Sequence, residues 1–301
     1  MKALVLSAGG SFGAYQIGAW AALEEVGWRP DLIVGASIGA VNGWAISRGA
    51  SAEDLMYLWR DAPAVIEKPF PGGVDSTCRR VSLARRTGFF RSWVEHVFAV
   101  WAGGTARYDL WVTLTAWPSC ALHVAKGPHW SAEHFVATCA VPAILPPVRV
   151  NGKRYMDGGT FCPLPLRVAI LAGATEIVAV DLLAVPPSML IRRARIAAAS
   201  LRNLVYGEPT EATPEELARV RLVRVQSPRL LGTLEDCFTW DPQRIEMLSQ
   251  AGYRDTLSAL EAQPALRKRP AGKAVASASP PLAFSLDSTR TSHAAGPRLN
   301  P

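Results

Sequence analysis

A serine flanked by two glycines is the residue in this sequence whose setting points most directly to chemistry. The motif is Gly35-Ala36-Ser37-Ile38-Gly39; an apolar run precedes it, and small, mostly apolar residues follow it. A serine on a sharp turn from a strand into a helix is strained so that its hydroxyl is exposed, and flanking glycines avoid clashes with both elements. The pattern indicates a nucleophilic Ser37. A glycine-rich turn with an incidental serine is the alternative, and the five residues alone leave it open.

A nucleophilic serine needs a general base, which in most serine hydrolases is a histidine. None of the five histidines follows a strand on a turn of small residues; they are His96, His123, His129, His134 and His293. Asp157 has that setting, because it follows a predicted hairpin strand and precedes Gly158 and Gly159. Glycines let the backbone turn sharply and leave the carboxylate unobstructed. Asp157 is therefore the candidate base, with an ordinary Asp-Gly turn as the alternative.

Acyl transfer also needs hydrogen-bond donors for the oxyanion that forms on the substrate. The candidate is the turn Gly9-Gly10-Ser11-Phe12-Gly13, whose backbone N–H groups could form a concavity that binds negative charge. A dinucleotide-binding turn is the alternative, since Asp31 lies 18 residues beyond Gly13, near the expected acidic position. The spacing is G-G-x-x-G rather than G-x-G-x-x-G, and this alternative leaves Ser37 and Asp157 unexplained.

The elements that must position these residues alternate between strand and helix. We expect strands over residues 3–7 and 32–34, each followed by a helix, over 14–26 and 38–48. Such alternation predicts an α/β fold with three α/β/α layers and a central, mostly parallel sheet, with the site at the carboxyl ends of the strands. The other main expectations are a hairpin over 148–156 with an Asn-Gly turn, a strand over 176–182 and a helix over 241–261.

Composition indicates how the chain divides into domains and in which cellular compartment the protein is expected. The chain has 301 residues, 49% of them hydrophobic, and we expect one domain over 1–262 and a disordered Pro/Ala/Ser-rich basic tail over 263–301. The five cysteines are widely spaced and lack a C-x-x-C pair, which argues against a disulfide framework or zinc site and for a reducing compartment. No apolar run reaches about 18 residues, so a transmembrane helix is not expected. The sequence therefore predicts a cytoplasmic protein without a metal site.

Taken in chain order, the three glycine-containing motifs resemble the patatin-like phospholipase family, a group of lipid acyl hydrolases with a Ser–Asp dyad. Two further segments are similar to the part of the family's sequence that leads to its aspartate. They are Ala140 to Val148 and Tyr155-Met156-Asp157-Gly158-Gly159. The resemblance spans roughly residues 2 to 260. It implies a lipid or ester substrate, an acyl-enzyme and no cofactor.

The resemblance also assigns roles to residues of this chain. It implies that Ser37 is the nucleophile and that Asp157 is the proton acceptor. It implies an oxyanion hole made by the amides of Gly9, Gly10 and Ser11. The remaining motif glycines would support these turns; they are Gly13, Gly35, Gly39, Gly158 and Gly159.

Two departures from the family pattern limit what can be carried over. Many relatives have an arginine or lysine in the first turn, where this chain has Ser11 and Phe12. Many follow the aspartate turn with Asn-x-Pro, where this chain has Thr160-Phe161-Cys162-Pro163-Leu164-Pro165. The first departure puts in doubt the selectivity for a phosphate or head group. The second puts in doubt which contacts hold Asp157 in place.

The formal net charge of +7 admits nucleic acid, an anionic membrane surface or acidic substrates as partners. The resemblance favours a lipid, so no nucleic acid is expected. The segment 79–101 places arginines beside aromatic residues, which suits peripheral contact with an anionic membrane; the alternative is a helix that buries its aromatic face in the core. An acyltransferase of similar fold and a non-catalytic lipid-binding relative remain alternatives to the hydrolase.

Overall fold

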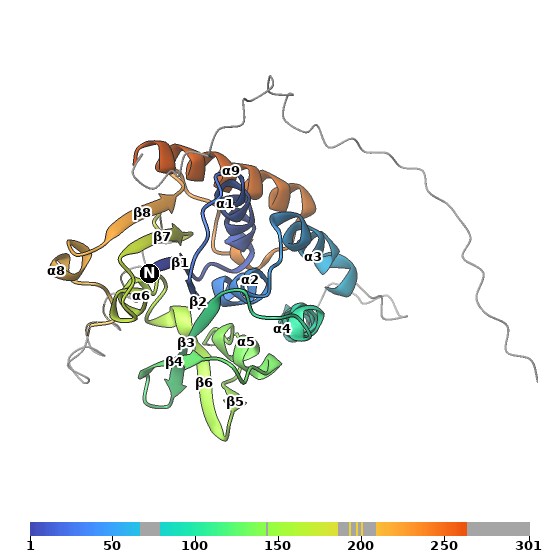
Figure 1. Ribbon diagram of the computed structural model, residues 1–301. Coiled ribbons are helices and arrows are strands. Elements are labelled where there is room, and N and C mark those ends of the chain that lie inside the picture. The colour runs from blue at the N-terminus through green and yellow to red at the C-terminus, as the bar shows by residue number, and fades with distance from the viewer. Residues whose placement is uncertain are drawn as a thin grey trace, which may run out of the picture. The chain divides into compact units, whose positions relative to one another are not determined.

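The computed structural model describes residues 1–66, 79–142, 144–185 and 209–263, and residues 193, 197 and 200 besides. The centre of this part of the chain is an eight-stranded sheet, and helices cover it. The strand order is β5-β6-β3-β2-β1-β7-β8, with β4 beside β3 (Figure 1). The parallel strands are β1 (Lys2–Leu6), β2 (Leu32–Ala36), β3 (Asp109–Trp117), β7 (Glu176–Asp181) and β8 (Arg221–Gln226). The antiparallel strands are β4 (Leu122–Lys126), β5 (Val148–Val150) and β6 (Lys153–Asp157). Apart from Gln263, the predicted tail lies outside the described residues.

Side chains of the central strands are buried on both faces of the sheet, as in other sheets covered by helices on two sides. In β1, Leu4 and Leu6 face the larger core, whereas Ala3 and Val5 face the smaller one. The larger core is packed by α1 (Ala14–Glu25), α2 (Ile38–Ser47), α3 (Ala52–Ile66), α4 (Arg79–Ala102), α5 (Ala132–Thr138) and α9 (Pro242–Glu261). The smaller core is packed by α6 (Leu166–Leu171) and α8 (Pro214–Leu217). The three-layer prediction is confirmed.

Strand β3 brings two strand ends together. Its residues 111–115 pair with β4 on one edge, so β2 and β6, which overlap that stretch, must share the opposite edge. Parallel β2 ends with Ala36 opposite Thr113, and antiparallel β6 ends with Asp157 opposite Leu114. The carboxyl ends of β2 and β6 therefore meet at neighbouring positions of β3.

Local turn chemistry explains the hairpin that leads into β6. Asn151 has φ 47° and Gly152 has φ 81°, and a type I′ turn needs positive φ at both central residues. The predicted Asn-Gly hairpin is confirmed. An irregular stretch over 62–86 is predicted from its prolines and glycines, which are Pro63, Pro69, Pro71, Gly72 and Gly73. This prediction is wrong at both ends, since α3 continues to Ile66 and α4 begins at Arg79. Residues 79–86 contain neither proline nor glycine, so those helix-breaking residues do not extend to the start of α4.

The aromatic residues of α4 pack into the protein. Trp93, Val94 and Val97 are buried in the larger core, and Phe90 and Phe98 pack against it. The side chains of Arg79, Arg80, Arg85, Arg86 and Phe89 lie outside what the structure describes. Where α4 is described, its aromatic face thus follows the core alternative rather than the membrane one. In the described part of the chain, every helix is too short or too polar to cross a bilayer.

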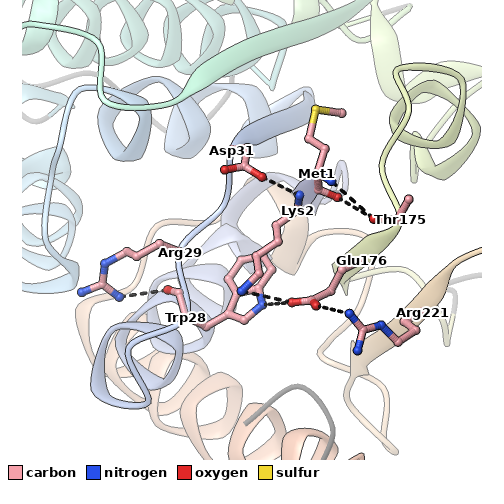
Figure 2. A network of polar contacts seen from close by, with 8 residues as sticks. All are labelled: Met1, Lys2, Trp28, Arg29, Asp31, Thr175, Glu176 and Arg221. Atoms are coloured by element: carbon pink, nitrogen blue, oxygen red, sulfur yellow. Dashed lines mark hydrogen bonds and ion pairs between the residues drawn. The ribbon is translucent and has the colours of Figure 1, made fainter. Parts of the chain in front are cut away.

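The amino ends of three strands are joined by one buried carboxylate (Figure 2). Lys2, Glu176 and Arg221 stand side by side on β1, β7 and β8. Glu176 Oε1 lies 3.4 Å from Lys2 Nζ, and Glu176 Oε2 lies 2.8 Å from an Arg221 guanidinium nitrogen. The Trp28 indole N–H also donates to Glu176, at 2.8 Å. Opposite charges here secure the register of the sheet at the end away from the serine.

Candidate active site

Ser37 and Asp157 are in direct contact. The Ser37 hydroxyl donates a hydrogen bond to Asp157 Oδ2 at 2.6 Å. Only 6% of Ser37 and 4% of Asp157 is exposed, so water is largely kept from the contact. The two residues are 120 positions apart, and the meeting of β2 with β6 along β3 is what joins them.

The backbone of Ser37 is strained. Its φ of 53° and ψ of −126° lie outside the regions that ordinary residues favour, at a cost of about 1–3 kcal/mol. A Cβ on Gly35 would lie 2.5 Å from Ala40 Cα, and one on Gly39 would lie 2.3 Å from the Leu6 carbonyl oxygen. Both glycines are therefore required by close packing of the strand against the helix, as the motif predicts.

Thr138, the last residue of α5, holds the strained serine from outside the motif. The Ser37 N–H donates to Thr138 Oγ1 at 2.9 Å, and the Thr138 hydroxyl donates to the Thr113 carbonyl at 2.7 Å. Thr138 thus ties the serine turn to β3. Sequence reasoning missed this residue, because no spacing rule relates it to a serine 101 positions away.

Backbone groups fix the Asp157 carboxylate and main chain. Asp157 Oδ1 accepts the Gly159 N–H at 2.6 Å, and the Thr115 hydroxyl donates to the Asp157 carbonyl at 2.9 Å. A Cβ on Gly158 would lie 2.0 Å from the Thr113 carbonyl oxygen, and one on Gly159 would lie 2.3 Å from Ala8 Cβ. The two glycines after the aspartate allow β3 and the first turn to approach this closely.

The turn from Gly9 to Gly13 lies beside both halves of the dyad. A Cβ on Gly13 would lie 2.6 Å from the side chain of Ile38, which follows Ser37, while Ala8 contacts Gly159. The turn is a 3₁₀ helix from Gly10 to Gly13 that runs directly into α1, and the first N–H groups of a helix have no acceptor within it. The Ser11 hydroxyl donates to the carbonyl of Asp236.

Asp31, the acidic residue of the dinucleotide-binding alternative, lies elsewhere. Its carboxylate accepts the Lys2 N–H at 2.7 Å, beside the amino end of β1 (Figure 2). A ribose-binding acid belongs at the carboxyl end of the second strand, near the glycine-rich turn. That alternative is therefore wrong.

A cysteine that the sequence analysis did not single out lies next to the dyad. The buried Cys139 thiol is within hydrogen-bond reach of the Ser37 side chain. Burial raises the pKa of Cys139 well above its usual value, and the Asp157 charge raises it further, while the Ser37 hydrogen bond acts in the opposite direction. A thiol in this state stays protonated and is a poor nucleophile at neutral pH.

The described histidines with resolved contacts are engaged away from the serine. His134 caps the start of α5 with Ser131, and His123 packs on the Tyr155 ring with 5.0 Å between ring centroids. Burial is the main cause that lowers the pKa of both histidines. Within the described ranges, no cluster of three or more His, Cys, Asp or Glu could hold a metal ion.

One family model and several known proteins align with this chain. The model of the patatin-like phospholipase family matches residues 4–98 and 131–170, which include the first turn, the Ser37 motif and Asp157. The crystal structure of VipD from Legionella pneumophila aligns over 87% of this chain and 67% of its own, at 14% identity and a TM-score of 0.47. The type III effector ExoU aligns over 86% of this chain and 52% of its own, at 16% identity and a TM-score of 0.35.

Curated relatives share more sequence identity but are far longer. Patatin-like phospholipase domain-containing protein 6 of Mus musculus is 32% identical over 189 residues, which are 60% of this chain and 13% of the mouse protein. Lysophospholipase NTE1 of Yarrowia lipolytica is 30% identical over 184 residues, which are 59% of this chain and 12% of that protein. The family model and these relatives show that this chain contains a patatin-like phospholipase domain.

Proposed function

We propose that this chain is a serine acyl hydrolase that cleaves carboxylic ester bonds of lipids, with Ser37 as nucleophile and Asp157 as proton acceptor. The observation that carries the proposal is the 2.6 Å hydrogen bond from a buried, strained serine to a carboxylate. The patatin-like phospholipase domain supports lipid hydrolysis as the reaction. We assign residues 1–262 to the catalytic domain.

The first half-reaction forms an acyl-enzyme. Ser37 Oγ attacks the ester carbonyl carbon while its proton passes to Asp157 Oδ2. Asp157 then returns the proton to the departing alcohol as the C–O bond breaks. The Gly159 amide on Oδ1 keeps the other oxygen of the carboxylate turned toward the serine during both transfers.

The oxyanion of the intermediate is assigned to the amides of Gly9, Gly10 and Ser11. They begin a helix whose first N–H groups lack intrahelical acceptors, and the residues that flank them, Ala8 and Gly13, lie beside Gly159 and Ile38. One such donor is worth about 2.7–4 kcal/mol of transition-state stabilisation. In the second half-reaction, Asp157 takes a proton from water as the water oxygen attacks the acyl carbon. Asp157 then returns this proton to Ser37 Oγ as the bond between Oγ and the acyl carbon breaks and the carboxylic acid leaves.

The substrate class is tested with a panel that separates head group from ester chemistry. The purified chain would be assayed for release of fatty acid from lysophosphatidylcholine, phosphatidylcholine and triacylglycerol, and for hydrolysis of short p-nitrophenyl esters. Lysophosphatidylcholine is a natural first choice, because one relative is named a lysophospholipase. Ser37→Ala is the control in each assay.

We expect acid release by the native chain and none above background by Ser37→Ala. Equal rates for the two proteins would overturn the proposal. An added alcohol acceptor distinguishes the reaction type: accumulation of a transferred acyl ester in place of free acid would make the chain an acyltransferase.

A further inference from the structure

Three exposed side chains form a row across β3, β6 and β5. Trp117 stands opposite Arg154, and Arg154 stands opposite Arg149. Side chains directly opposite on neighbouring antiparallel strands point to the same face of the sheet. Trp117 is 44% exposed, and both arginines and the adjacent Lys153 are exposed. Lys153 comes directly before Arg154 on β6, so it points to the other face, beside the turn of the hairpin. We call Trp117, Arg149, Lys153 and Arg154 the hairpin surface.

The hairpin surface brings like charges together. Arginines directly opposite on neighbouring strands repel each other and weaken the pairing. None of the ion pairs found in the described residues includes Arg149, Lys153 or Arg154. Between Asp109 and Asp157 the sequence contains one carboxylate, Glu133, against four lysines and arginines. Glu133 lies near Arg91 of α4, so it does not balance these charges.

The same residues surround a hollow that is open to solvent. It has a volume of about 600 Å³ and is lined by the hairpin surface together with Pro118, Ser119 and neighbouring backbone. Figure 1 shows the β5–β6 hairpin at the edge of the sheet far from β8, beside α5. The surface is thus accessible and able to receive an anionic group.

The hairpin surface and the proposed catalytic aspartate share strand β6. Arg154 and Asp157 are three residues apart, which is about 10 Å along the strand at 3.3 Å per residue, and their side chains point to opposite faces of the sheet. A bilayer at the hairpin would therefore contact the end of the strand that leads into the site, without contacting Asp157 itself.

We propose that the hairpin surface docks the protein on an anionic lipid bilayer. Arg149, Lys153 and Arg154 would contact lipid phosphates, and Trp117 would lie at the level of the head groups, where tryptophan is enriched in membrane proteins. Charge complementarity and the exposed indole favour a bilayer over a nucleic acid duplex. The proposal rests on the proposed lipid substrate, and it moves the membrane contact from the segment 79–101 to this hairpin.

The test is vesicle flotation of the full chain carrying Ser37→Ala, so that lipid is not consumed. Vesicles would contain phosphatidylcholine alone or with phosphatidylglycerol. The test variant adds Arg149→Gln, Lys153→Gln and Arg154→Gln. The control variant instead adds Arg219→Gln, Arg229→Gln and Arg254→Gln, which removes the same charge from exposed positions on other elements.

Each basic residue near an anionic leaflet contributes about five-fold in affinity, so we expect the test variant to lose at least about ten-fold in binding to anionic vesicles. The control variant should lose less than about two-fold. Trp117→Ala should reduce binding to the same vesicles by a smaller factor. Equal binding by the test and control variants, or equal flotation with neutral vesicles, would overturn the proposal. Binding to a duplex oligonucleotide, but not to vesicles, would overturn it also.

A separate readout distinguishes this proposal from the proposed function. The three glutamine substitutions in the chain with native Ser37 should leave hydrolysis of a soluble p-nitrophenyl ester unchanged, which also shows that the variant is folded. Loss of vesicle binding in a chain that hydrolyses no ester would support docking and contradict the hydrolase. If the chain hydrolyses the ester and the substitutions do not change vesicle binding, the hydrolase would be supported and the docking proposal would be contradicted.

Discussion

Two buried carboxylates in one sheet, Glu176 and Asp157, have opposite surroundings. Only 6% of Glu176 and 4% of Asp157 is exposed. Glu176 lies where β1, β7 and β8 begin and is held by Lys2, Arg221 and the Trp28 indole (Figure 2). Asp157 lies where β6 ends, and its oxygens accept from the Ser37 hydroxyl and the Gly159 amide.

The difference lies in which donor can release its proton. Ammonium, guanidinium and indole groups keep their protons at neutral pH, so the contacts of Glu176 serve the register of the sheet and no proton transfer. The Ser37 hydroxyl can pass its proton to Asp157 as it becomes a nucleophile. The strained backbone is also at the Ser37 end, where tight contacts maintain it, as strain at functional sites generally is.

The largest effect should come from removing either half of the dyad. Ser37→Ala and Asp157→Asn should each lower kcat by at least about 10⁴-fold, because catalytic residues that act as a unit fail together. Steady-state hydrolysis of a soluble ester measures this, with thermal unfolding as the control for folding. If the kcat of Asp157→Asn is within ten-fold of the native kcat, Asp157 is not the proton acceptor.

A smaller effect is expected from Thr138→Val, which keeps the shape but removes the hydroxyl. The buried Ser37 N–H loses its acceptor, at about 1–3 kcal/mol of stability. Displacement of the serine should lower kcat by about 10–100-fold, with KM little changed. Thr138→Ser should restore most of the loss. Equal kcat for the valine and serine variants would show that the hydroxyl does not position Ser37.

At the other end of the sheet, Glu176→Gln should affect stability alone. Lys2 and Arg221 lose their shared anion, which should lower the free energy of unfolding by about 1–2 kcal/mol in a urea titration. Ester hydrolysis at a temperature where both proteins are folded should not change. The matched control is Glu95→Gln, which breaks the exposed ion pair with Arg91. It should lower the free energy of unfolding by about 0.3–0.5 kcal/mol. A large fall in kcat for Glu176→Gln would contradict the division between the two ends.

The smallest effect is expected at Cys139. Because burial holds the pKa of its thiol well above the usual value, iodoacetamide at pH 8 should leave the folded native chain active. Cys139→Ala should change kcat by less than about three-fold, since the thiol takes no part in the proposed proton transfers. Inactivation by iodoacetamide that Cys139→Ala prevents would show a reactive thiolate beside the serine.

Local contacts account for what could be predicted from sequence. Gly35 and Gly39 fit only where the strand meets the helix a few residues away, so the motif itself carries the geometry around Ser37. The Asn151-Gly152 turn is equally local, and the two residues themselves predict it. The alternation of strands and helices was enough for the three layers.

Long-range pairing accounts for what could not be predicted. Thr138 reaches Ser37 only through the packing of α5 against β3, and Cys139 comes with it. The row of Trp117, Arg154 and Arg149 depends on the register of three antiparallel strands. The sequence of α4 is compatible with an aromatic face that contacts either a membrane or the core. The tertiary structure places that face in the core.

The central claim is that Ser37 is a nucleophile activated by Asp157, and covalent labelling with a fluorophosphonate probe tests it most directly. Intact mass should show one phosphonyl adduct on the native chain, and peptide mapping should place it on Ser37. Ser37→Ala should not be labelled, and Asp157→Asn should be labelled far more slowly. An unlabelled native chain, or equal labelling of Ser37→Ala, would contradict the claim.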